Sequence, residues 1–354
     1  MPVEKSPNLG SHIGHLGAAA LIAGSLGSFS TYAQQPAANF YTGKTIKFLI
    51  GFSPGGGYDA YARLLTHFLR NHIPGDPVLV PEYMPGGGGR IVSRYVYHAA
   101  PKDGTVIATA DQSLVFQQAL GDRSLQFDAE KFNWIGNVDA DNNVVFTWYK
   151  SGVKNLADAQ KVSVTLAATS ANTTSEAYPK VLNAILGTKF RIVRGYTGGN
   201  TANLAMENGE VAGRGASSWA NFKISKPDWI CDGKINVLVQ VGLRKVPDLP
   251  QVPLLLDIAG NDIDRTALRL LSQPIEIGHP LFTAPGVPAD RVATLRKAFD
   301  ESMRDPDFLK QAEAMKADVN PVSGDQLQKT VAEIVATPKA AAARLTSIIG
   351  ASGL

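Results

Sequence analysis

Glycine clusters are the residues in this chain whose type and spacing most clearly predict chemistry. Three extended apolar segments each lead into such a cluster, at residues 55–57, 86–89 and 198–199, and then into a helical pattern. Glycine lets backbone amides approach a ligand closely, and the first turn of a helix has N–H groups without partners. The helix dipole adds positive potential there, so the sequence predicts a cleft that holds a small anion.

Residues with other catalytic or metal-binding potential do not form a recognisable motif. The cluster at 55–57 has neither the Lys-Ser/Thr of a P-loop nor the glycine spacing of a dinucleotide fingerprint. His67 and His72 are five positions apart, which does not place both on one helical face as metal ligands. No G-x-S-x-G nucleophile elbow occurs. We therefore expect no catalytic residue, no metal and no cofactor.

A hydroxyl-rich segment and two arginines are further candidates for contact with an anion. Residues 169–175 contain five hydroxyl side chains between a predicted strand and a predicted helix. These hydroxyls can cap the helix or donate to a carboxylate. Arg194 and Arg214 lie on predicted strands that point to the same side of the cleft, where each could bind a carboxylate through both nitrogens or form a surface or interdomain ion pair.

Composition and the first residues favour an exported globular protein. The chain has 354 residues, of which 44% are hydrophobic, enough for a sizeable core and two domains. A net charge of +3 without a basic run does not indicate nucleic-acid binding. Residues 1–33 resemble a signal peptide cut near Ala33, with a disordered start or an uncleaved anchor as alternatives. The single Cys231 cannot form an intramolecular disulfide, so stability must come from the core.

Strand and helix patterns alternate along the chain, which predicts α/β layers with mostly parallel sheets. The expected strands are 45–52, 77–83, 105–110, 132–138, 143–148, 162–168, 189–196, 210–216, 235–241 and 276–283, and expected helices include one after Gly57, 90–98, 176–186 and 201–208. Pro179 is expected to delay or kink the helix at 176–186.

The same pattern predicts two lobes with a cleft between them. We expect the chain to cross into a second domain between residues 138 and 143 and to return after residue 241. Lobe 1 would contain residues 34–140 and 242–354, lobe 2 residues 141–241, with hinges near 139–143 and 241–244. Clefts between domains are favoured ligand sites.

The mature chain resembles the substrate-binding proteins of tripartite tricarboxylate transporters, the Bug or TctC-like family. The segments that carry this resemblance are 46–52 with 54–63, 84–89, 101–105, 196–199 with 209–211, and 285–288 with 305–308. They follow the family's order over essentially the whole mature chain. The resemblance implies a type II periplasmic-binding-protein fold, in which two α/β lobes close on a carboxylated solute. We accordingly expect a periplasmic monomer that delivers a small organic carboxylate to integral membrane transporter subunits.

The resemblance also implies that the loop after the first strand and facing loops of the second lobe hold the carboxylate. Together with the candidates named above, the expected ligand-binding residues are Phe52, Gly55, Gly56, Gly57, Asp59, Gly87, Thr169, Ser170, Thr173, Thr174, Gly198, Gly199 and Arg214. Asp59 is expected to organise its loop rather than to touch the anion. Residues 168–174 and 196–198 depart from the family's usual pattern, so the resemblance does not imply a particular carboxylate.

Two other functions use the same cleft. An exported enzyme acting on a carboxylate would need a general base, for which Asp59 is the one loop candidate. A periplasmic sensor would bind the same solute and contact a different membrane protein.

Overall fold

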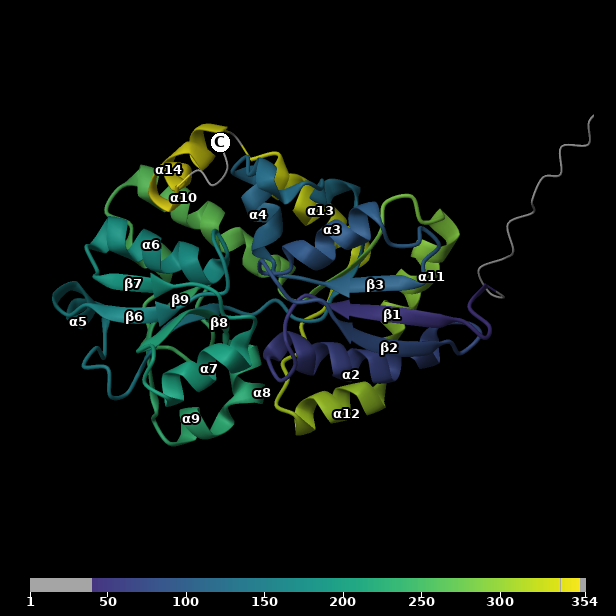
Figure 1. The fold of residues 1–354 in the computed structure, drawn as a ribbon, viewed down its shortest axis with the longest axis horizontal. Coiled ribbons are helices and arrows are strands. Elements are labelled where there is room, and N and C mark those ends of the chain that lie inside the picture. The colour runs from purple at the N-terminus through teal and green to yellow at the C-terminus, as the bar shows by residue number, and fades with distance from the viewer. Residues whose placement is uncertain (1–39, 338, 351–354) are drawn as a thin grey trace, which may run out of the picture. The chain divides into compact units, whose positions relative to one another are not determined.

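Two β-sheets organise the computed structural model, which describes residues 40–337 and 339–350 (Figure 1). The chain separates into the units Met1–Gln35 and Pro36–Leu354, and both sheets belong to the second unit. The expected signal peptide, residues 1–33, lies outside the described residues. No helix in the described part of the chain is long and apolar enough to cross a membrane.

The first sheet has six strands in the order β11-β4-β10-β3-β1-β2. Its strands are β1 (Thr45–Ile50), β2 (Val78–Tyr83), β3 (Val106–Thr109), β4 (Asn133–Asn137), β10 (Pro280–Thr283) and β11 (Val322–Ser323). β1 is parallel to β2 and β3, whereas β10 is antiparallel to β3 and β4. In the inner strand β1, Ile46, Phe48, Leu49 and Ile50 are buried, and the continuous apolar run 48–50 is as expected for a strand with helices on both faces of the sheet.

Helices cover both faces of the first sheet and close its core (Figure 1). These helices are α2 (Gly57–His72), α3 (Arg90–His98), α4 (Ser113–Ala119), α11 (Ala289–Ser302), α12 (Pro306–Ala314) and α13 (Gly324–Val335). On α2 the apolar residues recur at helical spacing, and Leu65 and Leu69 are buried against the strands. Pro288 is the N-cap of α11, and the side chain of Ser323 caps α13 by accepting from the amide of Gln326.

The second sheet has five strands in the order β7-β6-β8-β5-β9. They are β5 (Asn143–Trp148), β6 (Val164–Ala167), β7 (Phe190–Val193), β8 (Gly213–Ser218) and β9 (Ile235–Val241). On one face lie α6 (Thr174–Leu186), α10 (Asp262–Ser272) and α14 (Lys339–Ile349), and on the other lie α7 (Gly199–Glu207), α8 (Trp219–Ser225) and α9 (Pro227–Cys231) (Figure 1). The short α5 (Leu156–Lys161) follows β5.

The segment after residue 241 is shared between the two sheets, although the sequence analysis assigned all of it to lobe 1. Leu268 and Leu271 of α10 and Leu345 of α14 are buried in the core of the second sheet. The chain returns to the first sheet between α10 and β10, through a 3-10 helix, Gln273–Ile277. The strand expected at 276–283 is present only over its last part, as β10 (Pro280–Thr283). An amphipathic pattern shows that a helix has an apolar face, and does not show which sheet that face covers.

Pro179 lies inside α6, yet the helix begins at Thr174 and continues to Leu186, so the predicted late start is wrong. Proline removes the N–H that would bond to the carbonyl of Ser175. Gly215 of β8 packs on this turn, where a Cβ would overlap the Ser175 carbonyl oxygen and lie 2.8 Å from Cγ of Pro179. The missing side chain at 215 therefore lets α6 lie close against the sheet.

We predict that Gly215→Ala lowers the free energy of unfolding by about 1–3 kcal/mol, because the new methyl group must displace backbone that is already closely packed. Urea denaturation of the purified protein measures the change. Gly260→Ala is the matched control, since a Cβ there meets nothing within 4 Å. Equal urea midpoints for the two variants would show that the contact between α6 and β8 accommodates a methyl group at residue 215.

Candidate functional site

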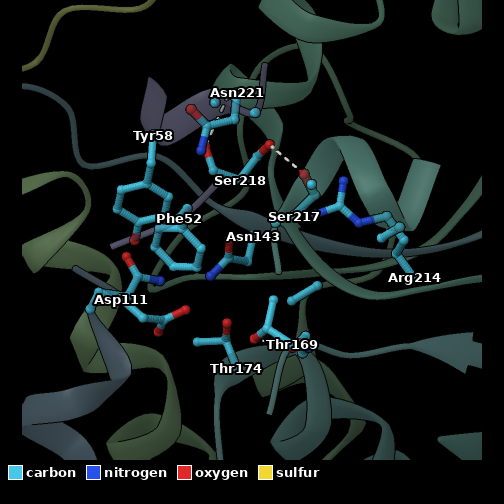
Figure 2. A pocket seen from close by; sticks show the side chains of 18 of the residues that line it. Phe52, Tyr58, Asp111, Asn143, Thr169, Thr174, Arg214, Ser217, Ser218 and Asn221 are labelled. Atoms are coloured by element: carbon cyan, nitrogen blue, oxygen red, sulfur yellow. Dashed lines mark hydrogen bonds between the residues drawn. The ribbon is translucent and has the colours of Figure 1, made fainter. Parts of the chain in front are cut away.

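A cavity of about 80 Å³ lies between loops of the first sheet and loops of the second (Figure 2). A single water molecule needs about 10–15 Å³ of such volume, so the cavity has room for a small solute. The residues on its wall that matter below are Phe52, Gly56, Gly57, Tyr58, Asp111, Asp141, Asn143, Thr169, Thr174, Gly198, Gly199, Arg214, Asn221 and His279. Both sheets therefore contribute to one enclosed site.

The wall contains the first residues of three long helices from different parts of the chain. α2 begins at Gly57, α6 at Thr174 and α7 at Gly199. The N–H groups of a first helical turn have no intrahelical acceptor, and the aligned peptide dipoles place positive potential at this end. The predicted arrangement of helix N-termini around an anion site thus has a structural basis at two of the three glycine clusters.

The loops that carry those two clusters are hydrogen-bonded to each other beside the cavity. The backbone amide of Ser53 donates to the carbonyl of Thr197 at 3.2 Å, and the Ser53 hydroxyl donates to Oδ1 of Asn200 at 3.0 Å. A Cβ on Gly56 would lie 3.4 Å from the amide nitrogen of Gly199. The two glycine-bearing loops therefore face each other, as the sequence predicted.

Gly57 makes a second close approach between segments. A Cβ at this position would overlap the side chain of Asn221 on α8. Asn221 is buried, and its Oδ1 has no hydrogen-bond partner in the described part of the chain. The glycine at the start of α2 thus makes space for an amide from the other sheet.

The third cluster packs structure together instead of lining the cavity. Residues 86–89 all have positive φ, and a Cβ on Gly88 would lie 2.5 Å from Cγ2 of Thr173. The Thr173 hydroxyl donates to the Ser170 carbonyl at 2.9 Å. Neither Ser170 nor Thr173 lines the cavity, and the same holds for Gly87, which lies beside Arg90.

Asp59 has the organising role expected of it. Its carboxylate accepts from the amide of Gly55 at 2.8 Å, from Nε of Arg63 at 2.8 Å and from the hydroxyl of Tyr83 at 2.7 Å. Asp59 and Gly55 are outside the cavity wall, so Asp59 is not placed to act as a general base there. It fixes the loop that leads into α2.

Arg214 is the basic residue of the cavity wall, and it lies on β8. Nη1 donates to Oδ1 of Asn203 at 3.0 Å, and the guanidinium lies 5.9 Å from the ring centroid of Phe146. No acidic residue of the described chain shifts its titration, and burial alone lowers the pKa of Arg214 to about 10. The side chain is thus still a cation at neutral pH, and its charge is not neutralised by a carboxylate.

Arg194, the other candidate, is not part of the cavity. Its Nε donates to Oε1 of Glu176 at 2.9 Å, and Lys180 pairs with the same carboxylate at 3.0 Å. These contacts and the backbone amide of Asn172 outweigh burial and lower the pKa of Glu176. The ion-pair alternative for Arg194 is therefore correct.

Several wall residues carried no expectation from sequence, among them Asp111, Asn143, Asn221 and His279. Asp111 is the second residue after β3, and a polar residue just beyond the carboxyl end of a parallel strand was a usable signal. Asn221 and His279 had no local signal, because they reach the cavity through packing of distant elements. The His279 ring lies 4.3 Å from that of Tyr61, and burial lowers the pKa of His279 to about 3, so it is neutral.

Two carboxyl groups lie where the chain first crosses between the sheets. Asp139 is fully buried, with Oδ1 accepting from Asn320 at 3.1 Å and Oδ2 without a partner in the described residues. Burial and then the charge of Asp141 raise the pKa of Asp139 to about 8, and burial raises the pKa of Asp141 to about 6. Asp139 is therefore mostly protonated in the folded protein at neutral pH.

This titration predicts a dependence of stability on pH. An unfolded chain ionises an aspartate near pH 4, so between about pH 4 and 8 the folded state binds one more proton at Asp139. The free energy of unfolding then falls as pH rises through this window, by an amount on the order of a few kcal/mol. Asp139→Asn keeps the oxygen that accepts from Asn320 and removes the titration.

Urea unfolding of both proteins between pH 5 and 8 measures the effect. We expect the free energy of unfolding of Asp139→Asn to increase relative to that of the native protein as pH rises. Parallel pH profiles would mean that Asp139 is ionised in the folded state.

No protein-family model and no curated protein matches the sequence. Solved structures do match. The periplasmic binding protein BugD is 21% identical over 88% of this chain and 99% of its own, with a TM-score of 0.69. MatC from Rhodopseudomonas palustris with bound malate is 18% identical over 86% and 99%, with a TM-score of 0.67. A TctC solute-binding protein from Polaromonas is 18% identical over 86% and 99%, with a TM-score of 0.55.

These similarities establish the class of fold. The chain has the two-lobed α/β fold of periplasmic binding proteins, which confirms the fold expected from sequence. The similar structures named above include BugD and a TctC protein, the group that the sequence resembles.

Proposed function

We propose that this protein is an extracytoplasmic solute-binding protein of the Bug or TctC-like family, which captures a small organic carboxylate between its lobes. It would deliver this solute to a tripartite tricarboxylate-type membrane transporter. Similar structures are described with malate and with adipate, and both compounds are carboxylates. We further propose export by a cleaved signal peptide and a monomeric periplasmic form.

The observation that carries this proposal is the guanidinium of Arg214, which is partly buried on the cavity wall and has no carboxylate partner in the described residues. A partly desolvated charge gains from a counter-charge, and a carboxylate matches the guanidinium in charge and in planar geometry. Gly199 brings the N-terminus of α7 beside it, since a Cβ at Gly199 would lie 3.3 Å from Nη1 of Arg214. Two sources of positive potential therefore meet at one point of the wall.

Capture would require the lobes to separate and close. We propose as lobes the two sheets with the helices that share their cores, which places α10 and α14 with the second sheet. The hinge segments would be residues 138–142, the 3-10 helix Gln273–Ile277 and the link between α13 and α14. Asn142 stiffens the first segment, because its side-chain amide donates to Oε1 of Gln240 at 2.9 Å and to the carbonyl of Arg244 at 2.7 Å.

A thermal-shift screen of the mature protein against organic acids tests the proposal. A bound carboxylate present at a hundredfold excess over Kd stabilises the protein by about 2.7 kcal/mol. We predict that Arg214→Gln removes this stabilisation, since the variant keeps a polar side chain on the wall and loses its charge. Arg191→Gln on the exposed edge of β7 is the matched control and should respond like the native protein. Equal responses from Arg214→Gln and the native protein would remove Arg214 from the site.

We also predict that Gly57→Ala weakens carboxylate binding at least about tenfold, because the methyl group separates α2 from Asn221 and disturbs the wall. Titration calorimetry with an acid found in the screen measures the affinity. The ligand-free melting temperature is recorded alongside, with Gly260→Ala as the control for glycine replacement. Native affinity in Gly57→Ala would show that this contact plays no part in the bound form.

A further inference from the structure

The cavity that contains Arg214 also contains acidic groups on another part of its wall. Asp111 is the second residue after β3 of the first sheet, whereas Arg214 lies on β8 of the second. Figure 2 shows the two side chains on opposite sides of the cavity, with Asn143, Thr169 and Thr174 between them in that view. The site is therefore polar at two separated ends.

Asp111 is held in place by its own loop. Its Oδ1 accepts from the backbone amide of Ser113 at 2.8 Å, and its amide donates to the carbonyl of Gly88 at 3.4 Å. No lysine or arginine of the described chain influences its titration; burial raises the pKa of Asp111 and Ser113 opposes the rise. Asp111 is thus a positioned carboxyl group on a cavity wall without a cationic partner.

The ionisable side chains of the wall do not carry the charge expected of a receptor for dianions. Its ionisable acids are Asp111 and Asp141, and Arg214 is its one guanidinium within the described residues. His279 adds no positive charge, because burial keeps it neutral. A dicarboxylate gripped by Arg214 would bring its second carboxylate toward acidic side chains in a poorly solvated space, where like charges repel strongly.

A cationic group at the second end has the opposite effect. It supplies Asp111 with the counter-charge that the protein lacks and favours the ionised carboxylate. The stacked rings of Phe52 and Tyr58, with centroids 4.4 Å apart, form an apolar and rigid part of the same wall, against which a short carbon chain can pack.

Building on the proposed function, we propose that Asp111 determines specificity by selecting a small amphoteric solute. The carboxylate of the solute binds Arg214. A protonated amine or another cationic nitrogen of the solute, separated from that carboxylate by a short chain, binds Asp111. This specificity differs from that of the similar structures described with malate and adipate, which are dicarboxylic acids.

Matched probes test this inference. Titration calorimetry at pH 7.5 uses 4-aminobutanoate, 5-aminopentanoate and 6-aminohexanoate, the α,ω-diacids of the same lengths and the unsubstituted acids. The proteins are the native chain, Asp111→Asn, Arg214→Gln and the control Asp262→Asn, whose aspartate is fully exposed on α10. We expect the native protein to prefer an amino acid over the diacid of equal length by at least about tenfold.

Asp111→Asn should lose at least about tenfold in affinity for that amino acid and should bind the unsubstituted acid as before. Arg214→Gln should lose affinity for the amino acids, the diacids and the unsubstituted acids. Asp262→Asn should bind each probe as the native protein does. Native preference for the diacid, or an amino-acid affinity unchanged in Asp111→Asn, would overturn the role of Asp111 and leave the carboxylate receptor intact. Failure of every probe, together with failure of the organic-acid screen, would instead overturn the proposed function itself.

Discussion

A partly buried cation without a protein counter-charge is the constraint on which the site depends. Arg214 is positioned by Asn203 and by the ring of Phe146, neither of which neutralises it. The start of α7 lies beside it and adds potential of the same sign. Under the proposed function, the carboxylate of the solute supplies the counter-charge that this guanidinium lacks.

Glycine serves this arrangement in a way that differs from the usual picture of a ligand-binding loop. At Gly57 and Gly199 the missing side chains make room for Asn221 and Arg214, so that protein groups from other elements can approach the helix starts. At Gly88 the missing side chain makes room for Thr173. The need for glycine at these positions is therefore explained by close approach between segments of the protein, without any contact to a solute.

Local sequence pattern was sufficient for most of the elements and for part of the site. The helix at 90–98 and the strand at 235–241 have the predicted bounds, because apolar periodicity and flanking turn residues are local properties. Gly56 and Gly199 were predicted for the same reason. Asn221, His279 and the placement of α10 depend on how distant elements pack, and one sequence contains no direct record of that packing. Pro179 does not delay the start of α6, and Gly215 on a neighbouring strand leaves room for the turn that contains it.

The placement of α14 against the second sheet has a mechanical consequence. The chain connects the sheets through three links, and the last of them leads to this C-terminal helix. Two links can define an axis of rotation, whereas a third must deform whenever it lies off that axis. In the proposed opening of the lobes, α14 therefore moves with the second sheet, although it contributes no residue to the cavity wall.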